Sequence, residues 1–353
     1  MAYTTIPKSS ANFSTNLYTG TGSNLTINTG HQSDLIWIKQ RATVRPNCLF
    51  DSVNSSNFAG GNSKYLVSNT TASLTSDNST QITATSSTGF SIGTDNSDQI
   101  NGNGDTAVAW SWKANGAGSS NTDGSINTTK TSANTTSGCS IITYTGNATA
   151  GATIGHGLGI KPSMIIIKNL STTQDWIVYT QSLTATKILY LNSTGAFNDN
   201  NVFFNDTEPT TSLITLGSNS SVNGNGNSHI AYCFSDVQGY SKQGSYLGNG
   251  NADGAFVYTG FKPAFIMLKQ SSASGRNWEI YDSKRIGYNV ANYRLPPNTA
   301  GAEETNVNID ILSNGFKARS TDADVNASGA TYIYMAFAEE PLVSTNGIPA
   351  TAR

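Results

Sequence analysis

The stretch NGNGNSHIAYCF, residues 223–234, decides the fold, because similar stretches occur twice more, as NGNGDTAVAWSW (101–112) and NASGATYIYMAF (326–337). In each copy an aromatic residue follows the first asparagine by 11 positions. Gly- and Asn-rich turns supply positive φ at small steric cost, and the alternating residues that follow are typical of a β-strand. The chain therefore repeats one unit that closes with a turn and a strand.

The same three copies share their earlier elements, in the same order. Each opens with a tyrosine and a glycine-containing turn, and then has an apolar run closed by lysine, an aromatic strand, and a strand that runs into Asn-Thr or Asn-Ser. The tyrosines are Tyr18, Tyr144 and Tyr246, and the lysine-closed runs are LIWIK (35–39), MIIIK (164–168) and FIMLK (265–269). The aromatic strands are CLFDS (48–52), WIVYTQS (176–182) and WEIYDS (278–283), and the last strands are KYLVSNT (64–70), KILYLNST (187–194) and YRLPPNT (293–299).

These patterns predict an all-β protein of three tandem antiparallel β-sandwich, jelly-roll-like modules of about 100 residues each. No stretch has a sustained helical period. Residues 114–138 are rich in Gly, Ser, Thr and Asn, so we expect a flexible or extended linker that sets the first module apart from a closer pair. The expected boundaries are an N-terminal arm (1–12), module one (13–113), the linker (114–138), module two (139–238), module three (239–341) and a C-terminal tail (342–353).

The composition excludes several classes of partner. Charged residues make up only 12% of the chain and the formal net charge is −2, so the surface is polar but mostly uncharged. Without a dense Lys/Arg cluster, nucleic-acid binding is not expected. The start MAYTTIPKSS lacks the pattern of an export signal, and no apolar run approaches 18 residues, so membrane insertion is not expected either.

Residues that could carry chemistry are few. His31, His156 and His229 lie in different copies without partners at metal-ligand spacing, and Cys48, Cys139 and Cys233 sit in apolar contexts, so we expect structural roles and no metal or other cofactor. Segments 94–105 and 322–326 bunch oxygen ligands suited to Ca²⁺, although such residues also form turns for backbone reasons alone. The acid pairs Glu279/Asp282, Glu303/Glu304 and Glu339/Glu340 point to opposite faces of an extended strand. No catalytic residue and no enzyme activity is predicted.

The remaining hypothesis is a glycan-binding site. Alternation along 176–179 places one aromatic ring on each face of the strand, so at least one ring per copy is expected to face away from its partner. Rings beside polar loops suit sugar stacking, and Arg and Asp add directed hydrogen bonds. The candidate residues are Trp176, Tyr179, Trp278, Tyr281, Asp282 and Arg285. In the alternative interpretation, the rings fill both sides of a sandwich sheet.

Four stretches carry a resemblance to a known group of proteins: HGLGIKPSMIIIK (156–168), STTQDWIVY (171–179), 223–263, and GFKARSTDADVNASGATYIYMAFAEEP (315–341). They resemble repeated virion structural or tail-fibre-like proteins of marine and other aquatic tailed bacteriophages, which have a domain of unknown function. The opening MAYTTI and the closing GIPATAR are similar too, whereas RATVRPNCLFDSV (41–53) departs from the group's charged turn. The resemblance implies a location in the virion and supplies no catalytic residues.

Three functions follow from this resemblance and from the residues. The first is a tail-associated adhesin or fibre component whose polar loops and aromatic faces contact host surface glycans. The second is a decoration (cement) protein of the capsid or tail, and the third is a glycan depolymerase. Other virion proteins are the expected partners. A homo-oligomer, with a trimer favoured, is expected because phage tail appendages assemble on rotational symmetry axes.

Overall fold

The computed structural model describes residues 4–54, 64–76, 81–285, 289–343 and 347, and it confirms the all-β prediction. Within these residues the helical elements are two short ones, the 3-10 turn η1 (Ser9–Ala11) and the helix α1 (Ser220–Asn223). The neighbouring strands in the sheets pair antiparallel. Among the described residues, no helix has the length and apolar character needed to span a membrane.

Three stretches of the chain each form a lobe with one larger and one smaller sheet. Lobe 1 (13–112) has the sheets β1-β9-β3-β4-β5-β6 and β2-β8-β7. Its strands are β1 (Phe13–Thr19), β2 (Leu25–Asn28), β3 (Leu35–Gln40), β4 (Cys48–Asp51), β5 (Lys64–Val67), β6 (Thr75–Ser76), β7 (Ile82–Ser86), β8 (Gly89–Ile92) and β9 (Thr106–Trp112).

Lobe 2 (130–234) has the sheets β10-β11-β18-β13-β14-β15-β16 and β12-β17. Its strands are β10 (Lys130–Asn134), β11 (Cys139–Thr145), β12 (Ala152–Gly155), β13 (Met164–Asn169), β14 (Ile177–Thr180), β15 (Lys187–Tyr190), β16 (Asn198–Asp199), β17 (Leu213–Leu216) and β18 (Ser228–Phe234).

Lobe 3 (241–341) has the sheets β19-β25-β21-β22 and β20-β24-β23. Its strands are β19 (Ser241–Leu247), β20 (Phe256–Tyr258), β21 (Phe261–Gln270), β22 (Trp278–Asp282), β23 (Ile309–Leu312), β24 (Gly315–Ala318) and β25 (Thr331–Pro341). The order β19-β25-β21-β22 matches β1-β9-β3-β4 of lobe 1 and β11-β18-β13-β14 of lobe 2.

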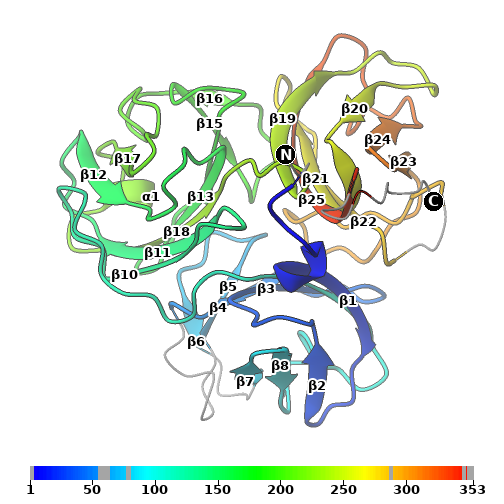
Figure 1. Ribbon diagram of the computed structural model, residues 1–353, viewed down its shortest axis with the longest axis horizontal. Helices are drawn as coiled ribbons and strands as arrows, with labels where there is room; N and C mark the ends of the chain where they lie inside the picture. The colour runs from blue at the N-terminus through cyan, green and yellow to red at the C-terminus, as the bar shows by residue number, and fades with distance from the viewer. Residues whose placement is uncertain (1–3, 55–63, 77–80, 286–288, 344–346, 348–353) are drawn as a thin grey trace.

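The lobes are arranged around a common centre, with the larger sheets inside and the smaller sheets outside (Figure 1). Central strands of the larger sheets are therefore covered on both faces. On β3, Ile36 and Ile38 belong to the core between the two sheets of lobe 1, while Leu35 and Trp37 belong to the core that the three lobes share. Two-sided burial explains why LIWIK reads as an unbroken apolar run rather than as an alternation.

Aromatic residues at matching positions of the three repeats meet at this centre. Trp112, Phe234 and Phe337 occupy the same register position in their strands, opposite Leu35, Met164 and Phe265. Their ring centroids lie 6.1 Å (Trp112–Phe234), 5.6 Å (Phe234–Phe337) and 5.6 Å (Trp112–Phe337) apart. The rings form a triangle in which each lobe contacts both others, so the lobes have a pseudo-threefold arrangement.

This arrangement corrects the expectation that the first module is set apart. Trp112 of lobe 1 packs directly against the other two lobes. The predicted linker 114–138 is ordered as well, since it contains β10 and buries Ile126 in the core of lobe 2. Its Ser132 accepts a hydrogen bond from the Asn115 N–H and donates one to the Gly116 carbonyl. Side-chain hydrogen bonds of this kind order a segment that composition alone would leave flexible.

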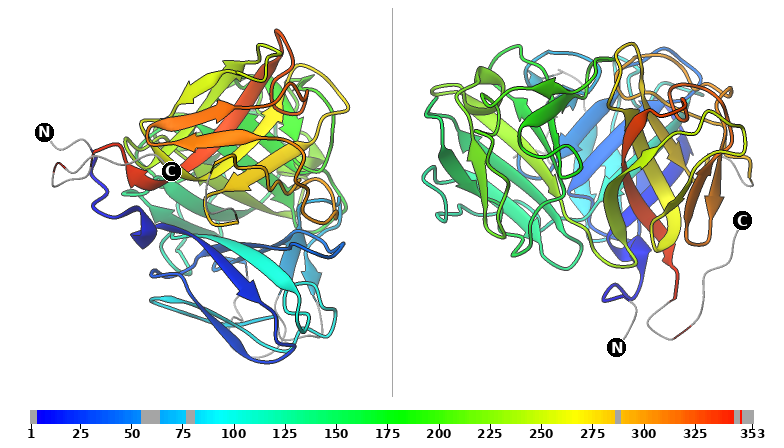
Figure 2. Two further views of the ribbon diagram at one scale, coloured as in Figure 1. Left: turned by 90° about the vertical axis from the view of Figure 1, so that its right-hand side faces the viewer. Right: turned by 90° about the horizontal axis from the view of Figure 1, so that it is seen from above.

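The two predicted ends of the chain are described in part. In the N-terminal arm, Ile6 is buried in the shared core, and the Ser10 carbonyl accepts a hydrogen bond from His31 Nδ1 at 3.1 Å. The C-terminal tail 342–353 lies mostly outside the described residues. The views in Figure 2 place η1 and the end of β25 on the same side of the molecule.

Candidate functional site

At one matching position of each repeat, a side chain donates a hydrogen bond to a backbone carbonyl of a neighbouring lobe. Trp176 Nε1 of lobe 2 donates to the Val67 carbonyl of lobe 1 at 3.0 Å, and Trp278 Nε1 of lobe 3 donates to the Tyr190 carbonyl of lobe 2 at 3.0 Å. At the same position of lobe 1, Asn47 donates to carbonyls of lobe 3, to Thr299 at 2.8 Å. The three contacts run in one rotational sense and close a ring of lobes.

The three lysines that close the apolar runs cross the same interfaces. Lys39 Nζ donates to the Ala300 carbonyl of lobe 3 at 3.2 Å, Lys168 Nζ to the Thr71 carbonyl of lobe 1 at 2.8 Å, and Lys269 Nζ to the Thr194 carbonyl of lobe 2 at 3.3 Å. All three side chains are buried. Burial lowers the pKa of each lysine to about 8, because the charged ammonium is removed from water.

Buried carboxylates accept hydrogen bonds at two of the three interfaces. Tyr232 Oη of lobe 2 donates to Asp51 Oδ2 of lobe 1 at 2.9 Å, and Trp110 Nε1 of lobe 1 donates to Asp282 Oδ2 of lobe 3 at 3.0 Å. Burial raises the pKa of Asp51 to about 6. At the third interface the matching position on β14 is Thr180, which carries no charge.

The residues proposed from the sequence for glycan contact are all buried. Their exposed fractions are 0% for Trp176, Tyr179, Trp278 and Tyr281, 2% for Asp282 and 5% for Arg285. The hypothesis that one ring per strand is exposed for sugar stacking is therefore wrong, and the alternative, in which the rings fill both sides of the sheet, is confirmed. Alternation does place the rings on opposite faces, but one face packs against the smaller sheet and the other against a neighbouring lobe.

The structure brings part of this predicted set together, but in a structural role. Arg285 Nε contacts Asp282 Oδ2 at 2.6 Å, and Arg285 Nη1 contacts Glu303 at 3.1 Å. Glu303 also pairs with Arg41 of lobe 1 at 2.7 Å. The Arg285 guanidinium lies 5.5 Å from the centre of the Trp110 ring. These contacts form a chain of charges that joins lobes 1 and 3. Each ion in the chain has a partner of opposite charge.

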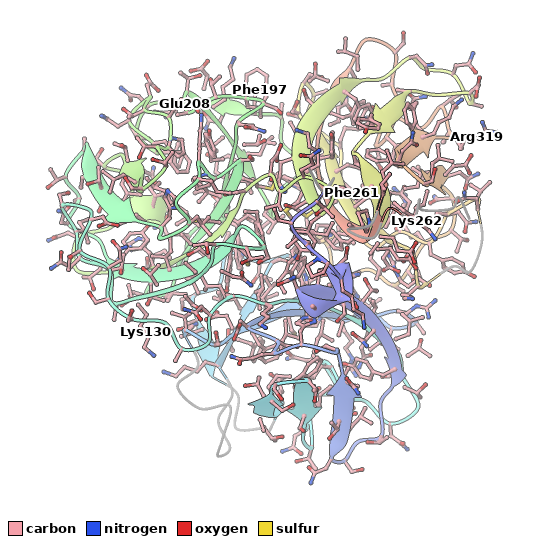
Figure 3. The ribbon with its side chains drawn as sticks, viewed as in Figure 1. Lys130, Phe197, Glu208, Phe261, Lys262 and Arg319 are labelled. Carbon is pink, nitrogen blue, oxygen red and sulfur yellow. The ribbon has the colours of Figure 1, made fainter. Side chains whose placement is uncertain are left out.

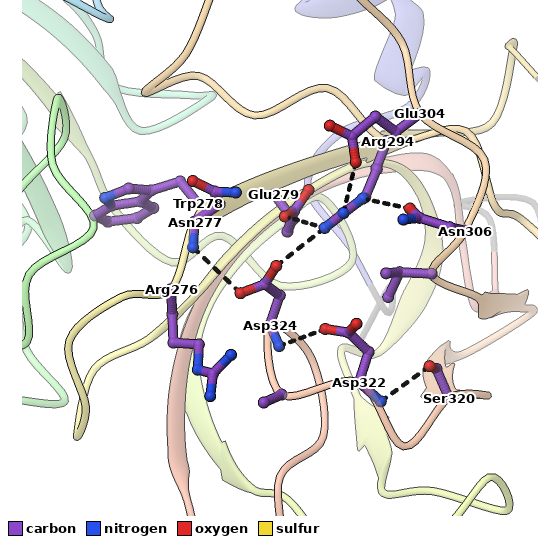
Figure 4. Close-up of polar contacts among 12 residues, drawn as sticks. Arg276, Asn277, Trp278, Glu279, Arg294, Glu304, Asn306, Ser320, Asp322 and Asp324 are labelled. Carbon is purple, nitrogen blue, oxygen red and sulfur yellow. Dashed lines mark hydrogen bonds and ion pairs between the residues drawn. The ribbon is translucent and has the colours of Figure 1, made fainter. Parts of the chain in front are cut away.

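A second ionic cluster, largely buried except for Glu304, lies in lobe 3 (Figure 4). Arg294 contacts Glu279 at 2.5 Å, Glu304 at 2.6 Å and Asp324 at 3.1 Å. Burial raises the pKa of Glu279 well above its usual range, and Arg294 opposes that shift. Glu279 pairs with Arg294 within lobe 3, whereas Asp282 accepts a hydrogen bond from Trp110 of lobe 1. The two carboxylates therefore lie on opposite faces of β22, as their spacing predicts. An arginine sits among these carboxylates, which is an arrangement for charge pairing and not the open pair that glycoside hydrolysis needs.

The histidines and cysteines are held in the interior. Burial lowers the pKa of His31, His156 and His229, and His229 stacks on Tyr144 with ring centroids 5.1 Å apart. The three cysteines are buried free thiols. Among the described residues, no group of three His, Cys, Asp or Glu side chains is placed to hold a metal ion.

The two oxygen-rich segments hydrogen-bond to their own backbones. Asp95 Oδ2 accepts from the N–H groups of Ile100 and Asn101, at 2.5 and 3.1 Å. Asp322 Oδ1 accepts from the Asp324 N–H at 2.7 Å. These contacts favour the backbone explanation of the Asp/Asn clusters over Ca²⁺ binding.

A groove of about 510 Å³ lies at the junction of lobes 2 and 3, beside Tyr258. Edge strand β19 of the larger sheet and edge strand β20 of the smaller sheet meet there. Asp236 and Lys242 contribute a carboxylate and an ammonium that contact each other at 2.6 Å. The groove is lined by Asp236, Val237, Gln238, Gly239, Ser241, Lys242, Tyr258, Thr259 and Gly260.

A second groove, of about 340 Å³, lies between lobes 1 and 2. Lys64 and Lys130 line it together with hydroxyl groups of Thr129, Thr143 and Ser171. Figure 3 labels Lys130 at the boundary of the two lobes. Lys130 Nζ donates to the Val53 carbonyl at 3.4 Å.

The groove beside Tyr258 was not predicted from the sequence. A signal was present, because FVY (256–258) alternates two aromatic residues with a valine where the matching strands read TIN (26–28) and TIG (153–155). The inter-lobe donors also had a signal, in the lysine that closes all three apolar runs.

Comparison with known proteins gives one family. Residues 8–341 match the model of a family described as Domain of unknown function (DUF7483). The comparisons with curated proteins and with solved structures found no match. The match spans all three lobes, so the chain belongs to the DUF7483 family.

Proposed function

We propose that this chain is a non-catalytic component of a tailed-bacteriophage virion, acting as a tail-associated adhesin that contacts host surface glycans. The observation that carries this proposal is the use of the reactive side chains. The six residues singled out for glycan contact, the three histidines and the three cysteines are all buried in the interior. What reaches solvent is mainly uncharged and polar, which suits contact with sugars better than catalysis.

Rigidity also supports a binding role. Three lobes that share one core and lock to each other through repeated hydrogen bonds hold their surface loops in fixed positions. A preorganised surface loses less conformational entropy when it binds. The resemblance to tail-fibre-like phage proteins supplies the expected location in the virion and the expected partners, which are other virion proteins.

A decoration protein of the capsid or tail is the second candidate, and the pseudo-threefold arrangement favours it. A body with three similar lobes can present similar contacts to three related subunits. The expectation of a homotrimer stays a prediction, which light scattering on the purified chain would test. A depolymerase has the least support, because the carboxylates of the Arg294 cluster are paired with arginine.

A competition experiment tests the adhesin proposal. The purified chain is added to host cells before the phage that encodes it, and adsorption is measured by counting unadsorbed particles. The proposal predicts that adsorption falls as the concentration of the chain rises, whereas heat-denatured chain has no effect. Unchanged adsorption at saturating chain would reject the adhesin and leave the decoration role.

A further inference from the structure

We infer that the groove beside Tyr258 is a binding subsite for an uncharged hexopyranose glycan. This inference rests on the proposed adhesin function and adds the site and the ligand class. It is carried by a difference between lobes that otherwise repeat each other closely. Tyr258 pairs with Gly315 in the same register as Asn28 with Gly89 in lobe 1, so the two positions are equivalent.

The two edge strands beside the groove are joined differently in lobes 1 and 3. In lobe 1, Asn16 of β1 donates a hydrogen bond to the Asn28 carbonyl of β2 at 2.8 Å, and this contact joins the two edge strands. The position of Asn16 is taken in lobe 3 by Gly244, which pairs with Tyr334 as Asn16 pairs with Ala109. Gly244 has no side chain to make that bridge, and the ring of Tyr334 lies over its position. In lobe 2, strand β10 covers the corresponding edge strand β11.

Exposed aromatic surface begins at Tyr258 in the groove and continues along β20 to Phe256, outside the groove lining. Tyr258 is 55% exposed and Phe256 is 48% exposed, while Val257 between them is 5% exposed and packs inward. The two rings therefore lie on one face of β20, roughly 7 Å apart along the strand. Aromatic rings at this spacing offer stacking surface for successive pyranose rings, and the tyrosine hydroxyl adds a polar contact. The equivalent face of lobe 1 presents Thr26 and Asn28 instead.

The charges around the rings are balanced, which selects an uncharged ligand. Lys242 contacts Asp236 at 2.6 Å, and beyond Phe256 Lys317 contacts Asp253 at 2.6 Å. Arg319, which Figure 3 labels at the outer edge of lobe 3, contacts Asp253 at 3.1 Å and Asp310 at 3.3 Å. An anionic glycan would have to compete with these carboxylates. Hydroxyl groups of a neutral sugar can instead bond to both partners of a pair.

The size of the groove favours a glycan over a protein. A volume of about 510 Å³ falls within the range of roughly 300 to 1,000 Å³ typical of sites for small ligands. A stable protein interface covers about 800 Å² on each partner, which is far more than one groove with two rings provides.

The test uses the whole chain and a printed array of bacterial surface polysaccharides that includes neutral and anionic members. Tyr258→Asn places the lobe 1 residue at its own register position, so the strand pairing is kept. The control Leu247→Asn removes another exposed apolar side chain of lobe 3, 64% exposed and outside the groove lining. We expect wild type and Leu247→Asn to bind neutral hexose polymers equally, and Tyr258→Asn to bind at least about tenfold more weakly, the equivalent of about 1.4 kcal/mol.

Three results would overturn the inference: no binding of the wild-type chain to any array member, binding restricted to anionic members, or unchanged binding by Tyr258→Asn. Adsorption separates this failure from failure of the adhesin function. If Tyr258→Asn competes with the phage as well as wild type does, the adhesin function stands and the groove is not its site. If even wild type fails to compete, the adhesin function itself falls.

Discussion

Replacing Asp51 by asparagine tests the contact between lobes 1 and 2 through its pH dependence. Asp51 accepts hydrogen bonds from the N–H groups of Val53 and Asn54 and from Tyr232 Oη, yet burial outweighs them and raises the pKa of its carboxyl from 3.8 to about 6. Between these two values the folded chain holds a proton that the unfolded chain has lost. The contribution of Asp51 to the free energy of unfolding therefore increases as the pH falls from about 6 to about 4.

The size of this effect follows from the shift in pKa. A difference of about two pKa units at about 1.4 kcal/mol each gives about 3 kcal/mol. Asparagine has no such titration, so the free energy of unfolding of wild type minus that of Asp51→Asn should rise by about 2–3 kcal/mol between about pH 7 and about pH 4. Urea denaturation of both proteins at each pH measures it. Taking the difference removes the contributions of other buried carboxyls, such as Glu279.

A companion variant checks the cause. Tyr232→Phe removes the hydroxyl that favours the ionised form of Asp51, so the pKa of Asp51 should rise further and the pH-dependent window should begin at higher pH. If the difference in free energy of unfolding between wild type and Asp51→Asn is the same at every pH, the raised pKa of a buried Asp51 carboxyl at this interface is refuted.

The remaining predictions concern the centre, the lysines and the thiols. Trp112→Ala removes one corner of the aromatic triangle, and calorimetry should give a loss of about 3–5 kcal/mol with one cooperative transition. Separate transitions for the lobes would contradict the shared core. Burial lowers the pKa of Lys168 from 10.5 to about 8, so the unfolded chain binds the extra proton between these values and the free energy of unfolding should increase with pH across that window. The increase should be smaller in Lys168→Met, and equal slopes in denaturation series would argue against a buried lysine. Burial raises the pKa of the Cys139 and Cys233 thiols, and Cys48 is buried too, so a disulfide reagent should label these cysteines only after unfolding; rapid labelling of the native chain would contradict their burial.

Much of the strand content was predictable because the repeats share their turns and apolar runs. Gly- and Asn-rich turns such as NGNG (223–226) depend on local backbone preferences, which a sequence expresses directly. The run MIIIK (164–168) likewise predicts a buried strand, and the structure places β13 there.

The burial of both faces of the aromatic strands was not predictable from alternation alone. Trp176 and Tyr179 could be glycan-binding residues only if one face of their sheet met solvent. In the structure a neighbouring lobe covers that face, and only contacts between residues far apart in the chain, such as Trp176 with Val67, decide this. Alternation gives the direction of a side chain within a sheet but not what lies opposite the sheet.

The groove beside Tyr258 depends on comparing matched positions rather than on a motif. Gly244 and Tyr258 are unremarkable residues taken singly. They gain meaning when strand pairing shows that lobe 1 has Asn16 and Asn28 in their places and joins its edge strands there. Register within a sheet of this kind is fixed only by the folded chain.

Electron microscopy of virions labelled with an antibody against this chain tests the proposed function most directly. The proposal predicts gold particles on the tail, with antibody fragments that block adsorption to host cells. Label confined to the capsid would contradict the adhesin and favour the decoration role. Virions of the encoding phage that carry no label, and no peptide of this chain by mass spectrometry, would contradict a virion function altogether.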